Sequence, residues 1–277
     1  MKATDIGTSH DPILPEAGHR QFEEDGFTVL RGLFRQDEIA ELNREFMAMS
    51  GAGPIPGHFE PRQPETVDPS DPLHRYPRVL HPHRINDLAL RFLLDPRLRG
   101  VLETLFGEEV LAAQSMFYFK PPGARGQALH QDNMYLRVEP GTCVAAWIAC
   151  DVIDPDNGVL EVVPGTHRMD LFCPEEADAG LSFVRDYVPP PPGLTAVAVD
   201  MEPGDVLFFN GTLIHGSQPN RSPDRFRRSY IGHYVGRSAQ RIGSYYHTLS
   251  MGGDPVPLRE SEGASPCGTE FAPVAPH

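Results

Sequence analysis

The chain has 277 residues, of which 40% are hydrophobic and 22% charged, and its formal net charge is −14. The hydrophobic fraction allows a packed core and excludes global disorder. The acidic balance argues against nucleic-acid partners, which require Lys and Arg to neutralise phosphates, but it does not exclude a basic pocket inside the protein.

The N-terminal third is expected to be largely helical. Ile39, Leu42 and Phe46 follow one another at helical spacing and would share one buried face. Residues 50–77 contain several Gly, Pro and His and little periodicity, which predicts a long irregular segment of the kind that often forms lids or binding loops. In chain order we expect a mobile arm over residues 1–17, a short strand over Gly26–Arg31, and helices over Gln36–Met49, Leu88–Leu94 and Pro96–Phe106.

The character of the chain changes at about residue 108, where β-branched and aromatic runs begin that are bounded by Gly, Pro, Asn or Asp. We interpret residues 18–250 as one domain with a helical part over about 18–107 and a β-core of about eight strands over about 108–237. A Gly- and Pro-rich tail of low order is expected over 251–277. The predicted core strands are Gln114–Lys120, Thr142–Val152, Val159–Val163, Leu194–Val199, Asp205–Phe209 and Arg228–Val235.

The cysteines and the absence of apolar spans bear on the compartment. Cys143, Cys150, Cys173 and Cys267 form no CxxC pair, and we expect free thiols in a reducing cytosol. On one strand Cys143 and Cys150, seven residues apart, would face opposite sides. No charged-then-apolar leader and no apolar run of about 18 residues occurs, so a cytoplasmic protein without a membrane partner is expected. The sequence does not indicate an oligomeric state.

His130 and Asp132 are separated by one residue, and on a strand their side chains would point to the same side, with Gln131 pointing away. Alone, this motif is a weak signal, because it also describes a polar pair at a strand end. His215 follows an apolar run and the turn signal Asn210-Gly211. Two imidazoles and one carboxylate can occupy one face of a six-coordinate metal and leave the other face open, which suits non-haem Fe(II).

An arginine follows the second histidine closely. Arg227 lies in the run that begins at Asp224, and if that run forms the strand next to His215, Arg227 points toward the metal. A guanidinium there can take the far carboxylate of a dicarboxylic acid in a two-pronged hydrogen bond. These residues indicate a 2-oxoglutarate-dependent iron oxygenase.

These motifs resemble the phytanoyl-CoA dioxygenase family of Fe(II)/2-oxoglutarate oxygenases, over roughly residues 20 to 235. The resemblance implies a mainly β fold with flanking helices, in which a double-stranded β-helix, a cupin-like jelly roll, carries the metal at one open end. It is carried by Glu24–Phe27, Val29–Gly32, Phe119–Pro122, Gln127–Asp132, Ala146–Ala149, Asp156–Gly158, Val163–His167 and His215–Ser217.

By position, the resemblance implies that His130, Asp132 and His215 are the catalytic iron ligands. It implies that Arg227, six residues before His233, anchors the distal carboxylate of 2-oxoglutarate. Arg228 is the competing choice, and strand alternation lets only one of the two arginines face the pocket. The positions that would line the co-substrate site are Lys120, Trp147 and Ser217.

The implied reaction uses Fe(II), 2-oxoglutarate and O₂ and releases succinate and CO₂. A C–H bond of a small molecule would be hydroxylated, although desaturation, cyclisation or epimerisation can begin in the same way. Halogenating members of the family lack the carboxylate ligand, so Asp132 favours hydroxylation. Asn133, Tyr135 and Arg137 follow the ligands directly and are candidate substrate contacts, with a solvated strand edge as the alternative.

Two other classes of function stay open at this point. One is a jelly-roll metal-binding protein that keeps a vestigial site, against which Arg227 and Lys120 argue. The other is a cupin-type metalloenzyme that uses no 2-oxoglutarate. The run His81-Pro82-His83 could suggest a second metal site, but the proline and the adjacent Arg84 favour a structural loop.

Overall fold

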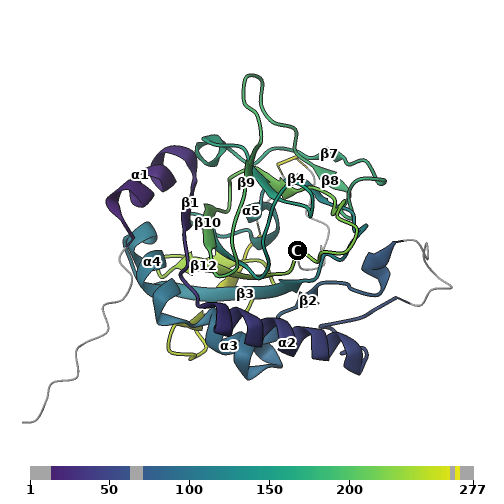
Figure 1. Ribbon diagram of the computed structural model, residues 1–277. Helices are drawn as coiled ribbons and strands as arrows, with labels where there is room; N and C mark the ends of the chain where they lie inside the picture. The colour runs from purple at the N-terminus through teal and green to yellow at the C-terminus, as the bar shows by residue number, and fades with distance from the viewer. Residues whose placement is uncertain (1–13, 63–70, 263–265, 269–277) are drawn as a thin grey trace, which may run out of the picture.

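The computed structural model describes residues 14–62, 71–262 and 266–268, and it is built from two stacked antiparallel sheets with helices against the larger one (Figure 1). This is the double-stranded β-helix that the sequence predicted. The seven-stranded sheet has the order β1 (Phe27–Leu30), β10 (Val206–Asn210), β5 (Cys143–Ala149), β12 (Ser229–Gly236), β3 (Val110–Tyr118) and β14 (Leu249–Ser250), with β2 (Val79–Leu80) also paired to β3. The four-stranded sheet has the order β4 (Gln127–His130), β11 (His215–Ser217), β6 (Leu160–Val162) and β9 (Val197–Val199).

Strand β5 shows how the sequence builds the sheet. All its residues are buried, because one face meets the helices and the other meets the smaller sheet. Ala146 and Ile148 join the cluster beneath the helices, and Trp147 joins the cluster between the sheets. Cys143 and Cys150 are free, buried and in clusters on opposite sides of the sheet, as the alternation predicted.

The helices cover the outer face of the larger sheet, and Figure 1 shows α2 and α3 lying beneath β3. In α4, Asp95 accepts a hydrogen bond from the backbone amide of Arg97 at 2.9 Å, Pro96 begins the helix, and Gly107 ends it with φ 69°. These local signals explain why α4 begins and ends where expected. The helices are α1 (Glu16–Asp25), α2 (Gln36–Ala52), α3 (Asp87–Leu93), α4 (Pro96–Phe106) and the short α5 (Asn133–Leu136).

The N-terminal boundary differs from the expected one. Helix α1 was not predicted, because Phe22 is its one buried residue and gives no helical period. Leu14 is also buried and joins the core cluster with Phe22. Residues 14–17 of the expected arm therefore belong to the fold, and residues 1–13 lie outside the described part of the chain.

The expected low order of the C-terminal tail is wrong for residues 251–262. Val256 and Leu258 pack against a buried cluster, and this burial of apolar surface stabilises the folded-back position of the segment. Arg137 also donates a 2.7 Å hydrogen bond to the Ser261 carbonyl. The segment ends in β15 (Arg259–Glu260), which pairs with β13 (Arg241–Ile242), and a second small pair is β7 (Glu175–Glu176) with β8 (Asp186–Tyr187).

Two cysteines correct the expectation of four free thiols. Cys173 and Cys267 form a disulfide across 94 positions of sequence. No spacing motif in the sequence predicts this disulfide, because only tertiary folding brings the tail beside the loop that carries Cys173. None of the described helices is both long and apolar enough to cross a membrane.

His81 and His83 are buried beside β3 and do not form a metal clip. His83 Nδ1 lies 2.6 Å from the Ser115 hydroxyl, and the two imidazole centroids are 5.8 Å apart. Burial, reinforced by the charge of Arg84, lowers the pKa of each histidine to about 3. Both are therefore neutral structural groups at pH 7.

Counting thiols tests the disulfide. In denaturant without reductant, two thiols should react per chain, those of Cys143 and Cys150, and reduction should raise the count to four. Reduction, or the substitution Cys173→Ser, should lower the free energy of unfolding by about 2–4 kcal/mol, because an open chain has more unfolded conformations. Four reactive thiols without reductant would contradict the bond.

The buried histidines predict acid sensitivity. Their folded pKa of about 3 lies below the usual value of 6.5, so the unfolded chain takes up more protons and stability falls as pH drops from 6.5 toward 3. Between pH 7 and pH 5, each should cost about 2 kcal/mol in the free energy of unfolding. Urea denaturation of His81→Gln and His83→Gln should show a shallower pH dependence than that of the wild type.

Candidate metal and co-substrate site

His130 and His215 face each other across two paired strands. His130 is the last residue of β4, and the antiparallel register places His215, the first residue of β11, directly opposite. The strands approach closely because Gly216 has no side chain: a Cβ there would lie 2.7 Å from the Gln127 carbonyl oxygen. The imidazole centroids are 4.3 Å apart.

Backbone hydrogen bonds orient both rings. His130 Nδ1 lies 2.8 Å from the Ala128 carbonyl, and His215 Nδ1 lies 3.0 Å from the Leu213 carbonyl. Each Nδ1 must carry the proton to donate it, so each Nε2 presents a lone pair to the space between the rings. Burial and the neighbouring His215 lower the pKa of His130, which keeps its imidazole neutral.

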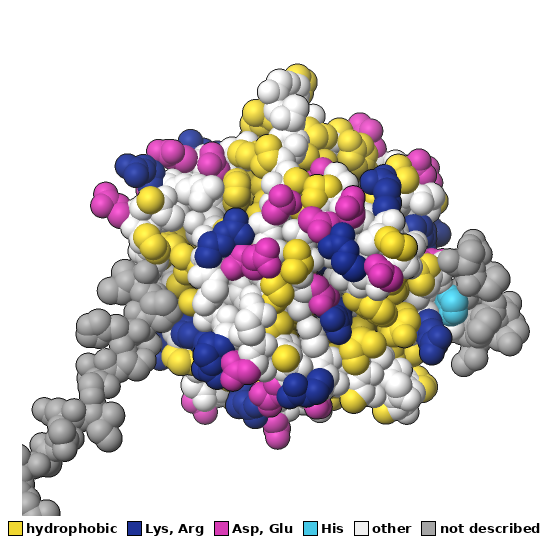
Figure 2. Space-filling model, viewed as in Figure 1, with side chains coloured by type: hydrophobic (Ala, Val, Ile, Leu, Met, Phe, Trp, Pro, Cys, Tyr) yellow, Lys and Arg dark blue, Asp and Glu magenta, His cyan; other side chains and the backbone are white. Residues whose placement is uncertain are grey.

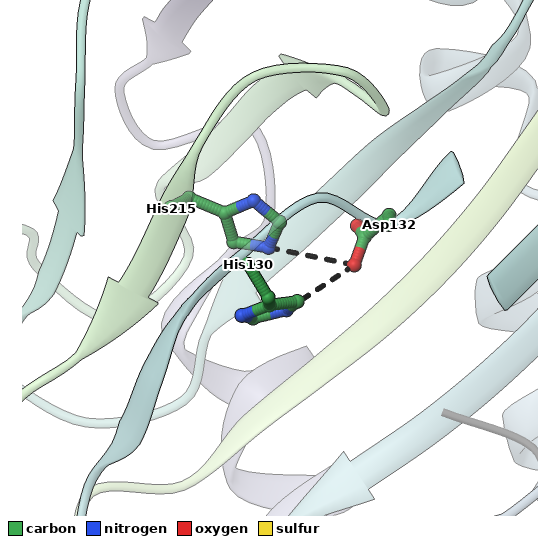
Figure 3. A group of neighbouring side chains, drawn as sticks. All are labelled: His130, Asp132 and His215. Carbon is green, nitrogen blue, oxygen red and sulfur yellow. Dashed lines mark ion pairs between the residues drawn. The ribbon is translucent and has the colours of Figure 1, made fainter. Parts of the chain in front are cut away.

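Asp132 completes the cluster by a different route from the one predicted. The strand ends at His130, and Asp132 has helical backbone angles at the start of α5, so strand alternation does not explain its direction. The turn still brings Asp132 Oδ1 to 3.4 Å from His130 Nε2 and 3.5 Å from His215 Nε2 (Figure 3). Gln131 points away, as expected, and donates to the Thr212 carbonyl at 2.7 Å.

A further histidine, His233 on β12, holds the second carboxylate oxygen. His233 Nε2 lies 2.9 Å from Asp132 Oδ2, so Oδ1 is left facing the two imidazoles. Burial by itself would raise the pKa of Asp132, but the neighbouring imidazoles of His215 and His233 hold it well below its usual range. Asp132 is therefore a carboxylate although it is only 1% exposed.

These ligand atoms fit one metal ion. One donor atom from each of His130, Asp132 and His215 lies within 4.8 Å of the others, and within the described ranges no other such group is found. Two imidazole nitrogens and one carboxylate oxygen form the donor set that suits Fe(II) with open positions. The second oxygen of Asp132 is fixed by His233, which is the outer support typical of metal sites.

Arg227 faces the same cavity and Arg228 does not. Arg227 lines the cavity with Trp147, and its guanidinium lies 5.2 Å from the centre of the indole ring. Arg228 instead makes hydrogen bonds of 2.6 and 3.0 Å to the carboxylate of Asp151. The two arginines come directly before β12 and differ in direction: Arg227 faces the cavity and Arg228 does not.

The Arg227 guanidinium is buried, and few neighbouring groups compensate its positive charge. It is 3% exposed, and burial lowers its pKa to about 10. Its Nη1 donates to the Ser229 hydroxyl at 3.1 Å, but its Nε has no hydrogen-bond partner and no carboxylate of the described chain forms an ion pair with it. A buried cation without a counter-charge is costly, so this arrangement is suited to an anionic ligand.

Lys120 contacts Ser217, which lines the cavity. Lys120 Nζ donates to the Ser217 hydroxyl at 2.8 Å and also to the Gln218 carbonyl. Burial and then the charge of Arg227 hold the pKa of Lys120 well below its usual value. Lys120 also has a left-handed backbone with φ 38°, which is uncommon for a residue other than glycine and is often found at functional sites.

The three candidate substrate residues occupy different places. The Asn133 side chain accepts a hydrogen bond from the Val138 amide at 3.0 Å and so braces the turn after Asp132. Tyr135 donates to Asp186 at 3.0 Å, and its ring centroid is 6.3 Å from that of His130. Arg137 binds the C-terminal segment at Ser261. Of the three, Tyr135 makes a ring contact with a metal-site imidazole, that of His130.

The sequence did not single out two residues of the site. His233 entered the sequence analysis only through its distance of six residues from Arg227. Its signal is that it lies in a fully buried strand, where a polar side chain needs a hydrogen-bond partner. Tyr118 lines the cavity from the end of β3 and was read only as part of a strand. The apolar lining is formed by Met116, Leu160, Phe209 and Ile231.

Comparison with known proteins agrees with this geometry. The family model "Phytanoyl-CoA dioxygenase (PhyH)" matches residues 22–229. Peroxisomal phytanoyl-CoA dioxygenase from Rattus norvegicus is 29% identical over 240 residues, covering 82% of this chain and 70% of that protein. Ectoine dioxygenase from Sphingopyxis alaskensis is 30% identical over 220 residues, covering 73% of this chain and 70% of that protein.

Solved structures show the same fold. EctD from S. alaskensis with 2-oxoglutarate and 5-hydroxyectoine superposes with a TM-score of 0.65 at 25% identity, covering 93% of this chain and 90% of that chain. The epimerase SnoN in complex with Fe³⁺, α-ketoglutarate and nogalamycin RO has a TM-score of 0.64 at 19% identity, covering 91% and 96%. Since the family model spans most of the sequence, the chain belongs to the phytanoyl-CoA dioxygenase family of Fe(II)- and 2-oxoglutarate-dependent dioxygenases.

Proposed function

We propose that His130, Asp132 and His215 bind the iron of this dioxygenase through two Nε2 atoms and one carboxylate oxygen. The support is the shared orientation of these atoms, which lie within 4.8 Å of one another, and the backbone hydrogen bonds that direct both Nε2 atoms inward. His233 would be a positioning residue that fixes the carboxylate through its 2.9 Å contact. Iron, when bound with 2-oxoglutarate and O₂, supplies the oxidising power for C–H hydroxylation, with succinate and CO₂ as co-products.

Arg227 would bind the distal carboxylate of 2-oxoglutarate, and this is the observation that carries the proposal. Its buried guanidinium forms no ion pair among the described residues and lines the cavity that holds the metal-site residues. Lys120 and Ser217 would line the same co-substrate site, and Trp147 would stack beside the guanidinium. A metal protein that used no 2-oxoglutarate would leave the Arg227 charge uncompensated, which disfavours the vestigial and cupin-type alternatives.

The substrate would be a small molecule, and neither a nucleic acid nor a membrane would be a partner. The apolar side chains of Met116, Leu160 and Ile231 line the cavity and would limit access of water to the reacting C–H bond. A cytoplasmic location is part of the proposal and is consistent with the two buried free thiols. The Cys173–Cys267 bond counts against a reducing compartment. Four reactive thiols in the thiol count would therefore support the cytoplasmic location, and two would argue against it.

Metal binding tests the ligand set. Asp132→Ala should abolish Fe(II)-dependent succinate release, because the remaining imidazoles cannot supply the third ligand. His233→Gln should weaken Fe(II) affinity by about 10–100-fold, as expected when a partner of a metal ligand is lost. Aerobic turnover with 2-oxoglutarate would measure succinate release, and anaerobic titration would measure Fe(II) affinity, with Asp151→Ala as the control that keeps wild-type affinity. Unchanged Fe(II) binding in Asp132→Ala would remove the carboxylate from the ligand set.

Co-substrate binding tests Arg227 separately. Anaerobic addition of 2-oxoglutarate to the Fe(II) protein should produce the visible iron-to-keto-acid charge-transfer band. Arg227→Ala should raise the 2-oxoglutarate concentration needed for this band by roughly 100–1000-fold, because a buried charge-assisted pair is lost. Arg228→Ala, whose partner is Asp151, should leave that concentration within about twofold of wild type. If the two variants behave alike, Arg227 is not the anchor.

A further inference from the structure

A second cavity adjoins the metal cavity and has no role in the function proposed so far. Tyr118 and Arg227 line both cavities, so the two share a wall. The second cavity is partly apolar, with Tyr76, Phe119 and Phe183 among its lining residues. Its position gives an organic molecule a place to lie next to the metal-site residues.

The lining of this second cavity is basic, whereas the whole chain carries a net charge of −14. Figure 2 shows acidic and basic side chains interspersed over the visible face of the molecule, so the surface there gives no sign of this concentration of positive charge. Five lining residues are Arg or Lys, and one lining residue, Asp71, is acidic. The basic residues are Arg62, Arg78, Lys120, Arg125 and Arg227.

Most of these cations have a structural partner or an assigned role. Arg125 forms a 2.7 Å ion pair with Asp71 and donates to two backbone carbonyls, so it braces the wall of the cavity. Lys120 donates to Ser217, and Arg227 is assigned to 2-oxoglutarate. The other two basic lining residues are Arg62, which is exposed, and Arg78, which is half-buried and also interacts with neighbouring groups.

Arg78 lies where the two cavities meet. It directly precedes β2, whose Val79 pairs with Phe117 of β3, the residue before Tyr118. Its guanidinium lies close enough to Tyr118, which lines both cavities, to interact with that phenol. It is also close enough to Tyr135, the residue beside His130, to influence the pKa of that phenol.

We propose that the second cavity binds the organic substrate, and that this substrate is an amphiphilic anion whose carboxylate or phosphate group is held by Arg78. The proposal rests on the proposed function, because it takes Arg227 as occupied by 2-oxoglutarate. The aromatic residues Phe119 and Phe183 would contact the apolar body of the molecule. A guanidinium matches the two oxygens of a carboxylate or phosphate, and a charge-assisted bond in a partly buried site discriminates strongly against a neutral analogue.

The chain contains a reporter for this binding event. Trp147 is its single tryptophan and lines the metal cavity, next to the shared wall. Fluorescence of the anaerobic Fe(II) protein, saturated with 2-oxoglutarate, would be followed during titration with octanoate, octyl phosphate and the neutral octanamide. We expect at least one anion to bind about 10- to 100-fold more tightly than octanamide. The carboxylate and phosphate arms show which anionic group the site prefers.

Substitutions at Arg78 locate the selectivity. Arg78→Gln should abolish the preference for the anion while octanamide binding stays within about twofold, and Arg78→Lys should retain part of the preference because it keeps the charge. Arg75→Gln is the matched control: Arg75 is exposed on the same segment, does not line the cavity, and should keep the full preference. Anion binding no tighter than octanamide binding, or a preference that survives in Arg78→Gln, would overturn the proposal.

The same samples separate this proposal from the proposed function. The charge-transfer band with Fe(II) and 2-oxoglutarate should be equal in wild type, Arg78→Gln and Arg75→Gln, because Arg78 is not assigned to the co-substrate. A missing band in the wild type contradicts the proposed function. A normal band without anion selectivity contradicts only the role of Arg78 and the substrate class.

Discussion

The pairing of β4 with β11 is the constraint on which the candidate site depends. It sets His130 opposite His215, and it requires Gly216, because a side chain there would collide with the backbone of β4. A shift of one residue in this register would turn one imidazole to the other face of the sheet. The larger sheet supplies His233 on β12, and the segment that leads into β12 supplies Arg227, so both sheets are needed for one site.

Buried charge links the separate parts of the molecule. Asp132 is compensated within the protein, because three histidines surround its carboxylate. Arg227 has no such partner among the described residues, and its burial is unfavourable until an anion binds. The active region is therefore preorganised for anions inside an acidic protein.

Local signals explain which elements were predictable. Asp95 and Pro96 mark the start of α4, and Gly107 marks its end. Strand β5 shows the continuous apolar run of a strand that is buried on both faces. Helix α1 and the folded tail lack such signals, because a few residues such as Phe22 and Leu258 are stabilised by distant contacts. The disulfide belongs to the same class, since its partners are 94 positions apart.

The sequence by itself determined the chemistry available to the site: the two histidines and the carboxylate, the following arginine pair, and the family that shares them. Only the tertiary structure decided how these groups are used. It turned Arg227 inward and paired Arg228 with Asp151, placed Asp132 by a helical turn instead of a strand, and brought His233 to the carboxylate. The physical reason is that residue type fixes what a group can bind, whereas burial and direction arise from packing between segments far apart in the chain.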